Sequence, residues 1–286
     1  MARHRRLEEP FPWEKLSQLR LHRIIGRCGL CRRFASWFRH RLAPTAAVHL
    51  QPTPTMFAGM SAEAAVRELR ARGVHQGFQL QRSAIREIVD YASRSPCVLP
   101  VGDGAPFRFA EVHDGRAPDG SPVAVADVDM ADRPCPAVER LSLDALLLDT
   151  VAGYLGYPPT RVATRLFWSP ASRLGDGLRR RNAQPVDFHY DIDPARSLYF
   201  FFYLTPTDRN SGAHVVLPTT HVRKPISIVL GSTFQSAKRL RALYPAVEPL
   251  VIEGEPGFGF AEDPACFHKV LAPRRADRLA LQLRYS

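Results

Sequence analysis

The chain has 286 residues, of which 45% are hydrophobic, so it is long enough to bury a sizeable core and ordinary in composition for a globular protein. No uninterrupted apolar run approaches the roughly 18 residues of a membrane-spanning helix, and arginines and acids stand where a signal peptide needs an apolar stretch. The five cysteines are an odd number, scattered through a chain too large to need disulfides. These features exclude an integral membrane protein and a disulfide scaffold, and they predict a cytoplasmic protein.

The formal charge of +11 is concentrated at the N-terminal end of the chain. Residues 1–44 contain ten Arg and one Lys against three Glu, a balance of +8, whereas the remainder carries only +3. This distribution argues against a nucleic-acid-binding protein. It predicts a basic N-terminal arm and a Pro- and Thr-containing linker at residues 1–55, followed by a catalytic unit at residues 56–286 whose first part, residues 56–160, is a helical prelude.

Residues 16–42 interleave apolar and arginine side chains, which is typical of an amphipathic helix. Two interpretations remain open. A basic helix with aromatic residues at its edge would make peripheral contact with the anionic inner face of a membrane, or the helix packs on the catalytic unit with its arginines in solvent. Cys28 and Cys31 have the spacing of half a zinc site, but no second pair of this kind follows, which argues against zinc.

Hydrophobic periodicity predicts helices first and strands afterwards. We expect helices at residues 62–71, 83–93 and 142–156, the first of them ended by Gly73. We expect strands at residues 107–112, 122–125, 162–168, 198–204, 213–217, 258–261 and 279–285, because these segments are short, rich in Val, Phe, Tyr and Leu, and bounded by turn residues. The predicted fold is therefore mainly β with flanking helices (α+β), a sandwich or jelly roll.

His189 and Asp191 stand two residues apart, so on an extended strand their side chains point to the same face. Two ligands of one metal ion require that arrangement. The third ligand must come from elsewhere, and His268, near the C-terminus, is the candidate. Two imidazoles and one carboxylate make the facial triad that binds Fe(II) and leaves three positions for a bidentate keto acid and O₂. We therefore predict that His189, Asp191 and His268 are metal ligands and catalytic residues.

Arg278 begins an alternating strand ten residues after His268. Alternation puts Arg278 on a polar face of this strand and three leucines on the opposite face, so the arginine is expected inside a barrel. A guanidinium there would bind the distal carboxylate of 2-oxoglutarate through two parallel hydrogen bonds. The alternative is that Arg278 faces solvent in a basic C-terminus, in which case Arg274 and Arg275 are the other candidates for binding this carboxylate.

Residues about 160–286 resemble the phytanoyl-CoA dioxygenase-like family of Fe(II)/2-oxoglutarate-dependent oxygenases. The resemblance covers a little under half of the chain, leaving the N-terminal arm without a counterpart. Five ordered elements carry it: His189-Tyr190-Asp191, the hydrophobic segment Leu198–Leu204, the stretch Gly212–His221, His268 and Arg278. One departure is Thr219-Thr220, which replaces the family's Gly-Ser before His221. The resemblance places His221 near the metal, and the alternative is a turn histidine that caps the following segment.

The resemblance implies a double-stranded β-helix, the cupin-like jelly roll, with Fe(II) as the metal and 2-oxoglutarate and O₂ as co-substrates. It implies that 2-oxoglutarate is held by the metal at one end and by Arg278 at the other, and is converted to succinate and CO₂. Related halogenating enzymes have a small residue where this chain has Asp191. The expected activity is therefore that of a dioxygenase that hydroxylates, desaturates or otherwise oxidises an unactivated C–H bond.

The sequence leaves the substrate open between a small molecule and a lipid-linked compound. Arg179–Arg181 would receive an anionic group, and Trp168, Tyr190, Tyr199 and Tyr203 would line a pocket; equally, an arginine run is usually solvated and strand aromatics usually belong to the core. Two other classes of protein stay open: a cupin-like metal-binding module without chemistry, and a metal hydrolase or isomerase that uses the same ligands without a keto acid.

Overall fold

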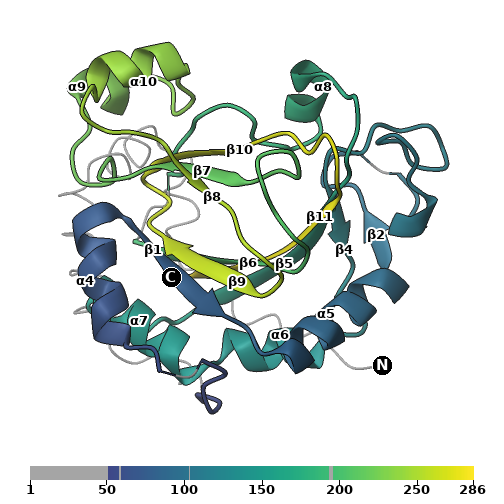
Figure 1. Ribbon diagram of the computed structural model, residues 1–286, viewed down its shortest axis with the longest axis horizontal. Coiled ribbons are helices and arrows are strands. Elements are labelled where there is room, and N and C mark those ends of the chain that lie inside the picture. The colour runs from purple at the N-terminus through teal and green to yellow at the C-terminus, as the bar shows by residue number, and fades with distance from the viewer. Residues whose placement is uncertain (1–50, 58, 103, 193–195) are drawn as a thin grey trace, which may run out of the picture.

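Two antiparallel β-sheets face each other and form the body of the protein (Figure 1). The computed structural model describes residues 51–57, 59–102, 104–192 and 196–286. The larger sheet has the strand order β1 (Val74–Gln79), β9 (Phe258–Glu262), β6 (Leu198–Tyr203), β11 (Arg278–Tyr285), β5 (Val162–Ser169), β4 (Ala126–Val128), β2 (Pro96–Val98) and β3 (Phe107–Arg108). The smaller sheet has the order β10 (Phe267–Val270), β7 (His214–Leu217) and β8 (Leu250–Ile252). The predicted mainly β jelly roll with flanking helices is confirmed.

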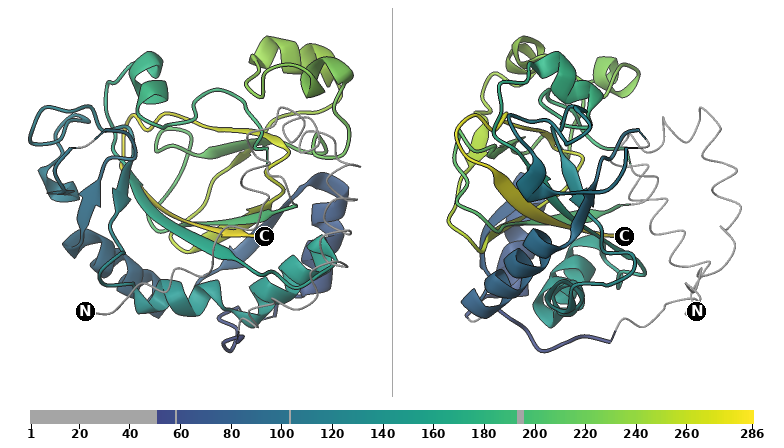
Figure 2. Two further views of the ribbon diagram at one scale, coloured as in Figure 1. Left: turned by 180° about the vertical axis from the view of Figure 1, so that it is seen from behind. Right: turned by 90° about the vertical axis from the view of Figure 1, so that its right-hand side faces the viewer.

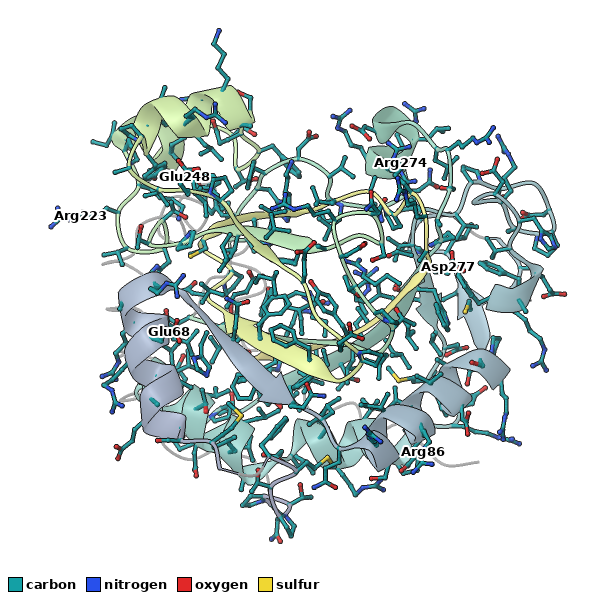
Figure 3. The ribbon with its side chains drawn as sticks, in the orientation of Figure 1. Glu68, Arg86, Arg223, Glu248, Arg274 and Asp277 are labelled. Carbon is teal, nitrogen blue, oxygen red and sulfur yellow. The ribbon has the colours of Figure 1, made fainter. Side chains whose placement is uncertain are left out.

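The helices lie outside the two sheets (Figures 1 and 2). Those that cover the outer face of the larger sheet are α4 (Ala62–Arg72), α5 (Arg82–Arg94), α6 (Pro136–Ser142) and α7 (Ala145–Leu155). On the side of the smaller sheet are α8 (Asp176–Arg181), α9 (Ile226–Val229) and α10 (Ala237–Leu243). The exposed faces of the covering helices carry charged side chains such as Glu68 and Arg86 (Figure 3), as the amphipathic pattern of a surface helix requires.

The alternation along β11 separates the hydrophobic core from the space between the sheets. Leu279, Leu281 and Leu283 are fully buried in the core that the larger sheet shares with the helices. Arg278 and Gln282 point the other way, between the sheets. Because β11 pairs with β5 on one side and β6 on the other, its register fixes which residues surround the interior space.

The start and end of α4 follow the expected capping chemistry. The Ser61 hydroxyl accepts a hydrogen bond from the Ala64 backbone amide at 3.4 Å, and Gly73 ends the helix in the left-handed conformation at φ 75°. A side chain at Gly73 would collide with the Cys266 sulfur, 2.4 Å from the position of a Cβ. The glycine therefore ends the helix and also lets the chain pass close to the turn before β10.

Several predicted boundaries were wrong for local reasons. The segment 107–112 is a strand only at Phe107–Arg108 and continues as a 3₁₀ turn (Phe109–Glu111), and the strand expected at 122–125 lies at Ala126–Val128 instead. The helix expected from 142 begins at Ala145, after Asp144 caps it with its carboxylate at 2.9 Å from the Leu146 amide. Strands β1, β2, β8 and β10 were not predicted, because they are short or contain polar residues that break the alternation.

The N-terminal predictions fall largely outside the described residues. The amphipathic helix at 16–42 and the Cys28 and Cys31 pair lie there. Of the expected linker, residues 51–55 are described, and they are anchored: the Thr53 amide donates to the Leu143 carbonyl at 2.8 Å, and the Thr55 hydroxyl donates to Asp144 at 3.1 Å. None of the helices in the described ranges combines the length and the hydrophobicity that a membrane-spanning helix requires.

Candidate metal centre

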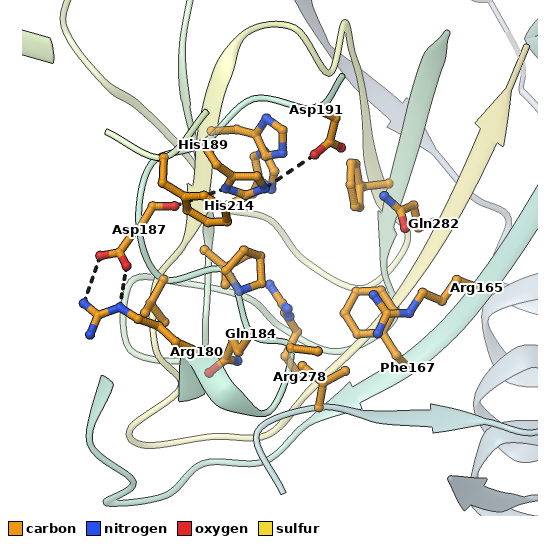
Figure 4. Close-up of a pocket in the computed structure, with 18 of the residues that line it drawn as sticks. Arg165, Phe167, Arg180, Gln184, Asp187, His189, Asp191, His214, Arg278 and Gln282 are labelled. Atoms are coloured by element: carbon orange, nitrogen blue, oxygen red, sulfur yellow. Dashed lines mark hydrogen bonds and ion pairs between the residues drawn. The ribbon is translucent and has the colours of Figure 1, made fainter. Parts of the chain in front are cut away.

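The three predicted metal ligands come together in the space between the sheets, where Figure 4 shows His189 and Asp191. His189 and His268 form an antiparallel bridge in which each backbone amide donates to the carbonyl of the other, at 2.9 and 2.8 Å. Residues facing each other across such a bridge project their side chains to the same side. The Asp191 backbone amide donates to the Pro264 carbonyl at 2.9 Å, so the segment remains extended from His189 to Asp191. Side chains two residues apart on an extended segment point to the same side, so the Asp191 carboxylate lies on the side of the two imidazoles.

The donor atoms of His189, Asp191 and His268 converge on one point. One ligand atom from each residue lies within 4.8 Å of the others, and the His189 Nε2 is 3.8 Å from an Asp191 carboxylate oxygen. The Nδ1 of His189 lies 3.1 Å from the carbonyl of Asp187, and the Nδ1 of His268 lies 3.0 Å from the carbonyl of Cys266. A carbonyl only accepts, so each Nδ1 carries the proton and each Nε2 presents a lone pair.

The electrostatics of these side chains suit a cation. Burial lowers the pKa of His268 to about 3, so this imidazole is neutral and able to donate a lone pair over the whole physiological range. Burial raises the pKa of Asp191, and neighbouring His189 opposes that shift. A divalent cation at the point of convergence would restore the ionised carboxylate. The donor set therefore fits a metal ion such as Fe(II), for which two imidazoles and a carboxylate are suitable ligands.

His214 and Glu262 are site residues that the sequence analysis missed. The His214 ring stacks on the His268 ring with 5.4 Å between centroids, and its Nε2 lies 2.9 Å from a carboxylate oxygen of Glu262. Burial lowers the pKa of His214 to about 3, so this imidazole is neutral, and burial raises the pKa of Glu262 to about 7, so ionisation of this carboxyl is disfavoured. His214 sits within the predicted strand 213–217, and only the long-range register brings it beside His268.

Arg278 is a buried cation that no acidic side chain compensates among the described residues. It is 3% exposed, and its guanidinium donates to the Gly212 carbonyl and, at 3.2 Å, to the Ser169 hydroxyl. Its Nε has no hydrogen-bond partner. A buried charge in this condition is costly unless an anion binds to it. The rival Arg274 lies 3.6 Å from Asp176, and Arg275 is exposed, so of the three only Arg278 points between the sheets.

A cavity of about 570 Å³ joins the convergence point to Arg278. One wall is the inner face of β11 and its neighbour β5, where Gln282 faces Arg165 across the strand pair. Arg165 is held by Asp127 at 2.8 Å, whereas Arg284, further along β11, is exposed and lies near enough to Asp191 to oppose the rise that burial causes in the pKa of that carboxyl. Phe234 closes the opposite side and stacks on His189 with 5.4 Å between ring centroids.

The predicted arginine run does not act as one anion-binding unit. Arg179 is fully buried and holds the loop around it, donating to Gln184 at 2.7 Å and to the Pro273 carbonyl at 3.1 Å. Arg180 lines the cavity but is paired with Asp187, and Arg181 is exposed. The three arginines therefore have different roles: Arg179 is structural, Arg180 forms an ion pair, and Arg181 lies in solvent.

Three of the four aromatic residues weighed as pocket lining belong to the protein core: Trp168 stacks on Phe109 with 4.3 Å between ring centroids, and Tyr190 and Tyr203 are buried. Tyr199 is buried as well, but its side chain forms a hydrogen bond with Asp191, which places it beside the candidate ligands. None of the four lines the cavity. His221, which the resemblance placed near the metal, lies in the turn after β7 against Gly73 and does not line the cavity either. The alternative of a turn histidine describes its position.

Comparisons with known proteins identify the fold. The sequence matches no protein-family model and no curated protein. Solved structures with a similar fold include EctD from S. alaskensis with 2-oxoglutarate and 5-hydroxyectoine, at 17% identity and a TM-score of 0.53 over 85% of this chain and 80% of that one. The epimerase SnoN in complex with Fe³⁺, α-ketoglutarate and nogalamycin RO has 13% identity and a TM-score of 0.55 over 78% and 82%. The α-ketoglutarate-dependent carbocyclase SnoK has 16% identity and a TM-score of 0.53, over 82% of this chain and 86% of that one. The protein therefore has the same fold as these three proteins.

Proposed function

We propose that this protein is a non-haem, 2-oxoglutarate-dependent dioxygenase that holds Fe(II) through His189, Asp191 and His268 and binds 2-oxoglutarate through Arg278. The observation that carries the proposal is the pairing of two features in one cavity: three converging metal donors and a buried arginine without an acidic partner. A keto acid that bound the metal at one end would bring its second carboxylate to that arginine. SnoN with Fe³⁺ and α-ketoglutarate, and EctD with 2-oxoglutarate, support the choice of metal and co-substrate.

Bound iron would supply the oxidising chemistry with O₂, and the protein's residues would do the positioning. The Gly212 carbonyl and the Ser169 hydroxyl orient the Arg278 guanidinium, which leaves its remaining donors for a carboxylate. Phe167 lies under that guanidinium, 5.5 Å from its centre, and keeps water from it. The pair formed by His214 and Glu262 packs against His268 and restricts the rotation of its ring.

We further propose hydroxylation of an unactivated C–H bond in a small molecule as the reaction. Asp191 supplies the carboxylate ligand, so no coordination position is reserved for a halide. The epimerase and the carbocyclase among the similar structures are enzymes of the same fold with other outcomes, so desaturation or a related oxidation is the nearest alternative. A cavity of about 570 Å³ must hold the co-substrate as well as the substrate, which favours a compact substrate. Gln282 and Arg284, on the wall beside the metal ligands, would bind its polar or anionic groups.

Residues 56–286 are proposed as the catalytic unit, because all four proposed functional residues lie there, and residues 1–55 remain a predicted arm and linker. The test is turnover of 2-oxoglutarate without added substrate, which many such sites would support slowly. We expect succinate only when Fe(II), O₂ and 2-oxoglutarate are all present, and we expect none from His268→Ala. A protein that binds Fe(II) but neither binds nor consumes 2-oxoglutarate would instead be the cupin-like metal-binding module, hydrolase or isomerase.

A further inference from the structure

Large apolar side chains are exposed on one narrow part of the surface. Of the five exposed large hydrophobic residues in the described chain, four recur at intervals of four positions: Val222 is 57% exposed, Ile226 78%, Leu230 67% and Phe234 57%. They surround α9. The buried residues of this segment, Ile228 and Leu240, anchor it to the core that includes Phe267. The segment is thus amphipathic, with an apolar side turned outward, which is uncommon unless the side has a partner.

The same segment carries positive charge and no negative charge. From Val222 to Val247 the sequence contains no acidic residue, and the first to follow is Glu248. Lys224 is turned inward and donates to the Thr220 carbonyl at 2.9 Å. The remaining four cations of the segment are exposed, and none is paired with an acidic side chain of the described chain: Arg223, Lys238, Arg239 and Arg241. We call residues 222–241 the α9–α10 ridge.

The ridge projects from the molecule and borders the cavity. Figure 1 shows α9 and α10 standing out at one corner beyond the smaller sheet, and Figure 3 shows Arg223 extending outward from the same corner. Between α9 and α10, Phe234 lines the cavity and stacks on His189. The Gln235 amide donates to the Phe188 carbonyl at 2.8 Å, which ties the ridge to the segment that carries the candidate ligands.

We propose that the α9–α10 ridge docks on an anionic lipid bilayer and brings the mouth of the cavity to its surface. Protruding aliphatic and aromatic side chains flanked by cations, without acids, are the composition that inserts among anionic headgroups. The charge disfavours two other occupants: a second copy would bring the same cations, and the N-terminal arm carries +8. At the surface of a bilayer the cavity would receive a compact substrate that partitions into the bilayer; that consequence rests on the proposed function, whereas the docking does not.

Two measurements on the full chain test the docking. The first is co-sedimentation with vesicles of phosphatidylglycerol and phosphatidylcholine, with pure phosphatidylcholine as the comparison. The second is hydrogen exchange, which reads each segment separately and so distinguishes the ridge from the arm. We expect binding only to the anionic vesicles, stronger at low salt, with slowed exchange in residues 222–243 and unchanged exchange in α5.

Matched variants keep the test specific. The double variants Ile226→Ser with Leu230→Ser, and Lys238→Glu with Arg241→Glu, should each weaken partition into anionic vesicles by about tenfold or more. The control changes Val101→Ser and Arg86→Glu remove an exposed apolar and an exposed basic side chain elsewhere, and should leave partition unchanged. Unchanged exchange in residues 222–243 on bound vesicles, or equal partition of all variants, would overturn the proposal. Capture of an acidic protein by the ridge without vesicle binding would overturn it as well.

Discussion

The two candidate histidine ligands are oriented by backbone carbonyls close to them in sequence. Asp187 and Cys266 each stand two residues before the histidine that they hold, so each short segment carries both a ligand and the group that fixes its tautomer. Only the bridge between the two segments is long-range. Residue type and spacing identified His189, Asp191 and His268 as candidate ligands, but not His214 and Glu262 as their neighbours, because that contact depends on strand register.

Removal of any candidate ligand should abolish iron binding and leave the fold largely intact. The changes His189→Ala, Asp191→Ala and His268→Ala each delete one donor from the convergence point, and none removes a member of the main hydrophobic core. Iron content after reconstitution and thermal unfolding of the metal-free protein measure the two expectations. Full iron content and full succinate formation in His268→Ala would show that His268 is not a metal ligand.

Arg278→Leu should raise the 2-oxoglutarate concentration required for binding while iron still binds. A carboxylate entering the site would lose a buried, charge-assisted contact, worth on the order of 2–5 kcal/mol. Arg278→Lys should be intermediate, because it keeps the charge but loses the planar fork. Arg274→Leu and Arg275→Leu are the controls. A larger loss from either control would mean that a different arginine binds the co-substrate.

The metal-free protein should become less stable as the pH falls from about 6.5 toward 3. His214 and His268 have folded-state pKa values of about 3, below the ordinary value of 6.5, so the unfolded chain binds more protons in this window. Each histidine contributes a slope of up to about 1.4 kcal/mol per pH unit. Glu262, with its pKa raised to about 7, opposes them above about pH 4.5. Urea unfolding from pH 4 to 7 measures the slope, and His214→Phe should reduce it.

At the scale of elements, β11 was predictable and the segment at His189 was only partly so. Three leucines alternating with polar residues specify both the strand and its buried face, because a half-buried strand has a period of two. The segment at His189 was expected as a strand, and it is an isolated extended pair with His268. Its partner is four residues long and lies far along the chain, so nothing local in the sequence identified it.

Two neighbouring changes on β11 should separate stability from cavity function. Leu281→Ala removes a fully buried core side chain and should lower the free energy of unfolding by about 2–5 kcal/mol. Gln282→Ala, one position on, should change it by less than about 1 kcal/mol, because that side chain faces the cavity. Chemical denaturation measures both. Similar losses from the two changes would contradict the register of β11.

For the whole molecule, the sequence predicted individual helices and strands better than it predicted how they pair in space. Local periodicity predicted mainly helices first and strands afterwards, but the structure interleaves them: β1 to β4 lie among the first helices, and α8, α9 and α10 lie among the later strands. The division into two facing sheets, with helices on one side and a cavity between, depends on pairings such as β1 with β9 and β10 with β7. Long-range pairings of this kind are chosen by burial and register across the whole protein.

Anaerobic addition of Fe(II) and 2-oxoglutarate to the metal-free protein tests whether one cavity holds both. We expect a weak visible charge-transfer absorption that requires both additions. It should be lost in His189→Ala and His268→Ala, and should need more 2-oxoglutarate in Arg278→Leu than in Arg275→Leu. Absence of the absorption although iron is bound, or the same absorption in the variants that lack a histidine, would contradict the binding of both in one cavity.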